Sequence, residues 1–303
     1  MQHKKLDSPI ISYLRCVKAP SESMVNDVLP VVSKSCKISP PKFKAQNTHG
    51  FTLIELIMVI VIVGIMATIT TDIITLPIKS YIDLERRTTL VDSAEMSLRR
   101  MQRDIRRALP NSIRITSGTV IELLHTSDGG RYRAKLASDG SGNILDFTSA
   151  DNSFDVLGSL NAIPNGELVI YNLGSTTADA YAGNNRETIA NISTINSITL
   201  SSAKLFPLQS PQQRFFIVDT PITYSCNSGE LRRYDNYSIS SSAPSLGSLS
   251  YNVQASSNNL TCAFKYNAGT ATRAGLVTLE ITLTDDEGES AKLIHQVHVD
   301  NMP

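Results

Sequence analysis

The chain has 303 residues, and 28 basic and 28 acidic side chains give it a formal net charge of zero. The charges are unevenly distributed, because residues 1–50 hold eight Lys or Arg and three Asp or Glu, which leaves 20 basic and 25 acidic residues after position 50. A chain whose larger part is acidic lacks the basic surplus typical of nucleic-acid-binding proteins. We therefore expect no nucleic-acid partner.

Residues 1–50 are rich in Pro and Ser, contain Cys16 and Cys36, and show no helical periodicity. Two interpretations of this segment stay open. It is either a genuine long leader, or translation begins further downstream, at Met24 or at a codon nearer Lys42. In both cases the segment is excluded from the prediction of the fold.

An apolar run follows, and Glu55 is the only ionisable side chain between Phe51 and Thr71. A helix of this length, at about 1.5 Å per residue, spans roughly 31 Å, close to the thickness of a bilayer core. Basic residues before such a run keep the N-terminus cytoplasmic and send the following chain outward. The run predicts a single membrane span over residues 51–76, in which the Glu55 carboxylate needs a partner. The alternative is an ordinary anchor that carries a stray Glu.

A second, amphipathic half of the helix is predicted for residues 77–109. Apolar residues recur there at helical spacing, and the pair Leu109-Pro110 indicates its end. The apolar positions are Leu84, Val91, Ala94, Leu98, Met101, Ile105 and Ala108. On the opposite face, charged residues at i,i+4 spacing predict three ion pairs. These pairs are Asp83/Arg87, Glu95/Arg99 and Arg100/Asp104.

Five arginines gather near the end of this helix, at positions 99, 100, 103, 106 and 107. Such a cluster fits nucleic acid or anionic lipid, but cations are also favourable near a helix C-terminus. We expect a solvated or subunit-facing surface.

Residues 110–303 change to short β-type runs separated by Gly, Ser, Asn and Asp, which predicts a head of antiparallel strands and an α+β fold overall. Two hairpins are predicted, at residues 127–130 (Ser-Asp-Gly-Gly) between strands 120–125 and 131–136, and at residues 284–289 between strands 275–283 and 292–299. Residues 237–259 read as a long Ser/Asn-rich loop. Further strands are expected at 144–147, 154–157, 168–173, 197–200, 214–218, 222–226, 230–234 and 263–266.

Residue patterns for catalysis are missing from the sequence. His295 and His298 would point to opposite faces of a strand and so cannot chelate one metal together. The acidic turn at residues 285–289 lacks the ligand spacing of an EF-hand, so we favour a solvated turn over a Ca²⁺ site. We expect no enzyme activity, no cofactor and no bound metal.

The arrangement of Gly50, Phe51, Thr52-Leu53-Ile54 and Glu55 after a basic stretch resembles the N-terminal signal of type IV pilins and of type II secretion pseudopilins. The resemblance implies that prepilin peptidase cuts between Gly50 and Phe51, that the new N-terminus is methylated, and that residues 1–50 are removed. It also implies that Glu55 docks against the Phe51 amine of a neighbouring subunit. The implied partners are the inner-membrane assembly machinery, other minor pilins and the major pilin.

Later segments resemble minor pilins of the J/W type, and most of all a subunit of mannose-sensitive haemagglutinin (MSHA) pilus biogenesis. These segments lie at 103–114, 128–133, 214–216, 221–226 and 298–301. The implied function is assembly initiation in a tip complex. A type II secretion minor pseudopilin and a pilus-tip adhesin are the alternatives.

Cys226 and Cys262 remain after residue 50. In an exported chain, such a pair favours a disulfide over two free buried thiols.

Overall fold

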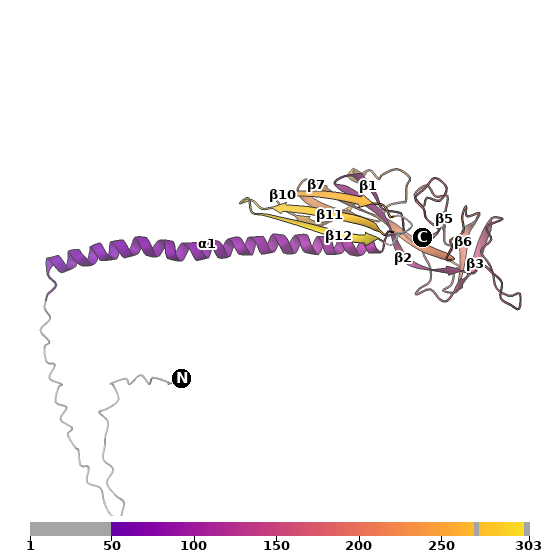
Figure 1. Ribbon diagram of the computed structural model, residues 1–303, viewed down its shortest axis with the longest axis horizontal. Helices are drawn as coiled ribbons and strands as arrows, with labels where there is room; N and C mark the ends of the chain where they lie inside the picture. Colours follow the sequence, from indigo (N-terminus) through magenta and orange to yellow (C-terminus); the bar gives the residue numbers. More distant parts are fainter. Residues whose placement is uncertain (1–49, 270–272, 300–303) are drawn as a thin grey trace, which may run out of the picture. The chain divides into compact units, whose positions relative to one another are not determined.

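The computed structural model describes residues 50–269 and 273–299 (Figure 1), so the expectations for residues 1–49 lie outside the described residues. The described chain divides into two units, with the boundary between Val61 and Ile62. One long helix is followed by antiparallel strands, which confirms the predicted α+β fold.

The predicted helix at residues 51–109 is α1, Leu53–Arg106, and it continues through Pro77 without a break. Before Leu90 the described side chains of α1 are exposed except those of Thr75 and Arg86, which are half-buried, and the side chains of Leu90, Ala94, Leu98 and Met101 are buried. The predicted stripe therefore begins six residues too early, at Leu84 instead of Leu90, because Leu84 is 63 % exposed.

Nine strands form the larger sheet. The pairing follows the order β5-β4-β7-β2-β3-β6, with β1 on β2, β8 on β7 and β9 on β8. An isolated bridge between Ile189 and Leu200 and a hydrogen bond from Ala190 N to Thr199 O (2.7 Å) connect the two ends of this path. The far part of the sheet therefore closes on itself like a small barrel. The strands are β1 Arg114–Ser117, β2 Val120–Tyr132, β3 Asp151–Leu157, β4 Glu167–Ile170, β5 Arg186–Thr188, β6 Ser197–Lys204, β7 Arg214–Asn227, β8 Glu230–Tyr234 and β9 Tyr251–Ser256.

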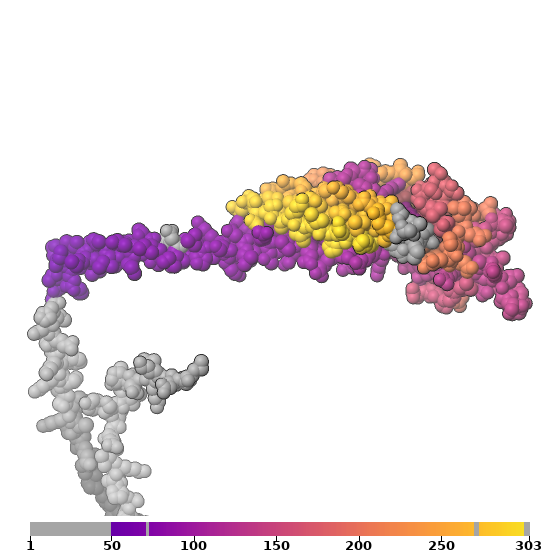
Figure 2. All heavy atoms as spheres, in the orientation of Figure 1, coloured from indigo at the N-terminus to yellow at the C-terminus, as the bar shows by residue number. Residues whose placement is uncertain are grey.

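A second sheet contains β10 Asn259–Asn267, β11 Gly275–Thr284 and β12 Ser290–Val299 in that order. Residues alternate strictly along β11, so that Val277, Leu279 and Ile281 face the core. The hairpin predicted at residues 284–289 is confirmed by the register of β11 and β12. Figure 2 shows these C-terminal strands packed along the last part of the helix.

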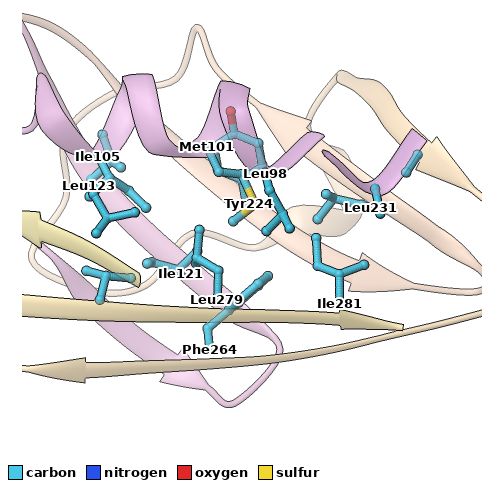
Figure 3. Packing of buried hydrophobic residues seen from close by; sticks show 14 of the residues in the cluster. Leu98, Met101, Ile105, Ile121, Leu123, Tyr224, Leu231, Phe264, Leu279 and Ile281 are labelled. Carbon is cyan, nitrogen blue, oxygen red and sulfur yellow. The ribbon is translucent and has the colours of Figure 1, made fainter. Parts of the chain in front are cut away.

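Two main cores fill the head. In the first, one face of α1 packs against strands of both sheets (Figure 3), and Leu98, Met101 and Ile105 belong to the same cluster as Ile121 and Leu279. The second core fills the barrel-like part with aromatic residues such as Tyr132, Phe154 and Phe215. Strands β2 and β7 are long because they run through both cores.

The hairpin predicted at residues 127–130 is wrong, since β2 continues through it. Gly129 and Gly130 do not form a turn. They allow β2 to pack closely against β7. A Cβ on Gly130 would lie 2.8 Å from Cζ of Phe215, and one on Gly129 would lie 3.0 Å from the Phe215 carbonyl oxygen. Register shifts between Leu124 and Asp128 bend the strand without ending it.

Other strand predictions also need correction. Residues 144–147 form no strand, because the Asp146 carboxylate accepts hydrogen bonds from Thr148 and Ser149 and closes a local turn. The strands expected at 214–218 and 222–226 are one strand, β7. The loop expected at 237–259 contains a 3₁₀ turn, Leu246–Ser248, and β9, which pairs with β8.

Only one of the predicted helical ion pairs forms among the described residues, Glu95 with Arg99 at 2.5 Å. Arg87 instead lies 3.7 Å from Glu289 in the β11–β12 turn. Asp104 turns inward to Arg233 of β8. Tertiary partners displaced the local ones because both side chains lie where α1 meets the sheets.

Candidate functional site: the N-terminal segment and its attachment to the head

Gly50 and Phe51 precede α1 and are exposed, Phe51 at 80 %. The helix begins at Leu53 because Thr52 caps it. The backbone N–H of Glu55 donates to Thr52 Oγ1 at 3.3 Å, and that of Leu56 donates to the Thr52 carbonyl at 3.2 Å. Thr-x-x-Glu is the spacing of a capping box. The Gly50–Phe51 peptide bond therefore lies in exposed chain immediately before a capped helix.

Glu55 is in the first turn of α1, and its side chain is exposed. A carboxylate is favourable there, because the free N–H groups of a helix N-terminus carry partial positive charge. Cleavage before Phe51 would add an α-amine four residues away. The segment would then carry one positive and one negative group at the start of an apolar helix. In two neighbouring chains, the amine of one chain can pair with the carboxylate of the other.

The helix after Glu55 is long and apolar enough to cross a membrane, by length and composition. Two of its hydroxyl groups are satisfied internally, since Thr68 Oγ1 donates to the Ile65 carbonyl and Thr70 Oγ1 to the Met66 carbonyl. Such internal bonds suit a hydrocarbon environment, which offers no water. A Cβ at Gly64 would meet nothing within 4 Å, so this position is open on the helix surface.

A buried polar contact fixes the second half of α1 to the head. Asp104 Oδ2 accepts from Arg233 Nε at 2.9 Å and from the Tyr224 hydroxyl at 2.8 Å. The side chains of Asp104 and Arg233 are only 16 % and 11 % exposed. Burial, with the nearby Asp104 carboxylate, raises the pKa of Tyr224 well above its usual range. Tyr224 therefore stays a donor throughout the physiological range.

The end of α1 is held by backbone bonds to β2. Leu109 N donates to the Leu124 carbonyl at 2.8 Å, and Thr126 N donates to the Arg107 carbonyl at 2.9 Å. Next to them, His125 Nδ1 lies 2.8 Å from Asp219 Oδ1. Burial opposes ionisation of Asp219, but the contact with His125 outweighs it and lowers the pKa of Asp219. Helix and head are thus joined by packing and by directional bonds.

A third polar cluster was not foreseen from the sequence. Glu122 is 1 % exposed and accepts from Arg114 Nε at 2.6 Å and from the Tyr237 hydroxyl at 3.1 Å. Arg114 also donates to the carbonyls of residues 240–242 and lies over the Tyr181 ring. This cluster anchors the start of the Ser-rich segment. Alternation along β2 would have placed Glu122 on a solvent face, but segment 237–242 covers that face.

Cys226 of β7 and Cys262 of β10 form a disulfide, with their Cα atoms 6.0 Å apart. The bond joins the nine-stranded sheet to the three-stranded sheet. It lies beside the first core, which both cysteines contact.

The residues considered for metal binding do not come together. His295 is half-buried on β12 and His298 is exposed, as expected for opposite faces of a strand. In the acidic turn, Asp285 Oδ1 accepts from the N–H groups of Glu287 and Glu289. Within residues 50–269 and 273–299, no group of three or more His, Cys, Asp or Glu is placed to hold a metal ion.

Comparison with known proteins identifies one segment. Residues 46–71 match the family described as "Prokaryotic N-terminal methylation motif". No curated protein and no solved structure gives a significant match to the chain. The match covers the N-terminal segment alone.

The class of protein follows from this motif and the helix that it begins. The motif supports the type IV pilin and pseudopilin superfamily, and implies processing by a prepilin peptidase in the context of pilus assembly. Together with the one helix among the described residues that is long and apolar enough to cross a membrane, it fits single-pass anchoring in the inner membrane.

Proposed function

We propose that this protein is a minor type IV pilin of the MSHA type, similar to the O subunit of that system, and that its role is not enzymatic. The observation that carries the proposal is an N-terminal methylation motif at the start of an exposed apolar helix whose second half is fixed to a large head. The MSHA assignment rests on the resemblance of the segments at 103–114, 128–133, 214–216, 221–226 and 298–301.

In the proposed pathway, prepilin peptidase cuts between Gly50 and Phe51, and the new amine of Phe51 is methylated. Glu55 of one subunit then pairs with the Phe51 amine of the next. Neither charge is stable alone in hydrocarbon, so their pairing sets the axial stagger between subunits. Open positions such as Gly64 let neighbouring helices approach closely.

The head favours a position at the filament tip, where the subunit would help to initiate assembly. After residue 109 the chain forms two sheets and two main cores, a bulky structure to fit along a shaft. At a tip no subunit lies above it. The head is oriented to the periplasm before assembly, because the basic stretch precedes the span.

Two alternative functions involve the same processing by prepilin peptidase. A type II secretion minor pseudopilin differs in the system that it serves, and the neighbouring genes distinguish it. A tip adhesin is favoured by the Ser-rich segment before β9, in which residues 241–243 are exposed while Arg114 holds its backbone.

The docking role of Glu55 is tested by Glu55→Val. We expect cleavage to remain largely intact, because the peptidase acts at Gly50, and we expect incorporation into pili to fall sharply. The measurements are processed protein in membranes and pilus number by electron microscopy. Glu85→Val is the matched control, since Glu85 is exposed on the same helix beyond the apolar run. Normal pilus numbers with Glu55→Val would contradict the docking role.

A further inference from the structure

A pocket of about 530 Å³ opens where α1 ends against β2 and β7. We call it the arginine pocket, and it is lined by Arg106, Arg107, Arg131, Arg214 and Phe216, with Thr126 at its side. The four guanidinium groups come from three separate segments of the chain. No acidic side chain is among the described residues that line it. The pocket therefore concentrates positive charge in a chain that is otherwise acidic after residue 50.

Ordinary structural roles explain only part of this arrangement. A cation at Arg106 is favourable in the last turn of a helix. Arg131 and Arg214, however, face each other directly in the register of β2 and β7. Like charges in that position destabilise a sheet. Within the described chain, the ion pairs closer than 4.0 Å include none made by Arg106, Arg107 or Arg131. Arg106, Arg107 and Arg131 thus carry positive charge in the pocket that a bound anion would neutralise.

The pocket also has an apolar wall. Phe216 is half-buried there, and Ala108 and Pro110 line the side of the helix end. Gly129 and Gly130 contribute backbone without side chains, because a Cβ at Gly130 would collide with the Phe215 ring. A small apolar surface therefore lies next to the guanidinium groups.

We propose that the arginine pocket binds an anionic saccharide, a sugar that carries two or more sulfate, phosphate or carboxylate groups. Guanidinium forks bind such groups in pairs of hydrogen bonds. The ring carbons pack on Phe216 and Pro110, which line the pocket. The volume lies within the range of about 300–1,000 Å³ typical of small-molecule sites. This binding activity is independent of processing at Gly50.

The test uses the full chain in a non-ionic detergent and a fully sulfated heparin-type disaccharide, with binding measured by calorimetry. Its unsulfated counterpart, inorganic sulfate and a short DNA duplex are the comparison ligands. The pocket variant is Arg106→Gln/Arg131→Gln. The matched control is Arg99→Gln/Arg103→Gln, which removes the same charge from exposed positions outside the pocket.

The sulfated disaccharide should bind, and its unsulfated counterpart should not. The pocket variant should weaken binding by about tenfold or more, since it removes charge-assisted hydrogen bonds, and the control should change it less than about twofold. Arg131→Lys keeps the charge but loses the fork, and it should give an intermediate loss.

Several results would overturn the proposal. One is no binding at about 1 mM disaccharide. Equal losses of affinity in the pocket variant and the control would indicate that binding depends on the overall charge of the protein and not on the pocket. Inorganic sulfate with the same affinity as the disaccharide would reduce the pocket to a simple ion site. Tighter binding of the DNA duplex, lost in the pocket variant, would assign the pocket to nucleic acid.

Discussion

At the scale of single residues, Arg233 is the side chain that most directly joins α1 to the head. Arg233→Met would leave the partly buried Asp104 with Tyr224 as its remaining partner among the described residues, and would also remove the contact of Arg233 with Asp235. Because these charges are only partly buried, the free energy of unfolding should fall by about 1–3 kcal/mol, less than for a fully buried pair. Urea denaturation of the full chain in detergent measures it. Arg103→Met, an exposed substitution on the same helix, should change stability by less than about 0.5 kcal/mol. Equal effects of the two variants would refute a structural role for the Asp104 contact.

Asp146 gives the head a measurable response to acid. Hydrogen bonds from Ser149 and then Thr148 lower its pKa from 3.8 to about 2. Because the folded state holds the carboxylate ionised, its contribution to stability is fully present above the unfolded pKa of 3.8 and is lost as pH falls to about 2. Asp146→Asn should therefore lower the urea midpoint at pH 6, and the difference from wild type should vanish near pH 2. Ser149→Ala, which removes one donor, should give a smaller difference with the same pH dependence. A difference that stayed constant across this range would contradict the assignment.

At the scale of elements, the disulfide is the covalent connection between the two sheets. Cys226→Ala/Cys262→Ala releases a loop whose ends are 36 residues apart in sequence. In the chain-entropy account this should lower the free energy of unfolding by about 3–4 kcal/mol. Chemical denaturation under non-reducing conditions measures the loss. Reducing agent should destabilise the wild type to a similar degree and leave the double variant unchanged. A reducing agent without effect on the wild type would indicate that the bond does not form in the protein.

The elements also show what the sequence could and could not predict. Helical spacing of Ala94, Leu98, Met101 and Ile105 correctly predicted the buried face of α1, because that pattern depends only on local geometry. The hairpin at residues 127–130 was wrong, since Gly129 and Gly130 are required by Phe215 of a strand about 85 positions away. The short strands β1, β5 and β9 were missed for the same reason. These strands are stabilised by pairing with neighbouring strands, and their own sequences show little β-type alternation.

The site residues likewise divide into those that a local sequence pattern predicts and those that only the fold brings together. Gly50, Phe51 and Glu55 are contiguous, so a linear motif describes them, and the family match at residues 46–71 contains all three. The arginine pocket joins the end of α1 to one arginine from β2 and one from β7. The sequence showed Arg106 and Arg107 only as part of a charged helix face. Pairing of β2 with β7 creates the pocket, and no linear spacing encodes it.

At the scale of the whole molecule, the described chain combines an exposed apolar helix with a head that is tied to the helix's second half. An isolated soluble protein would not maintain an apolar surface of that length. The surface requires a membrane before assembly and, in the proposed function, neighbouring helices after it. In the proposed function, processing at Gly50 is the step between the membrane and the filament.

The measurement that tests this account most directly is the mass and N-terminal sequence of the protein from cells with and without prepilin peptidase. The account predicts a chain that begins at methylated Phe51 when the peptidase is present, and an uncut chain when it is absent. An uncut chain in both strains would contradict it. Residues 51–76 would then be a plain membrane anchor, and the head would need a function of its own.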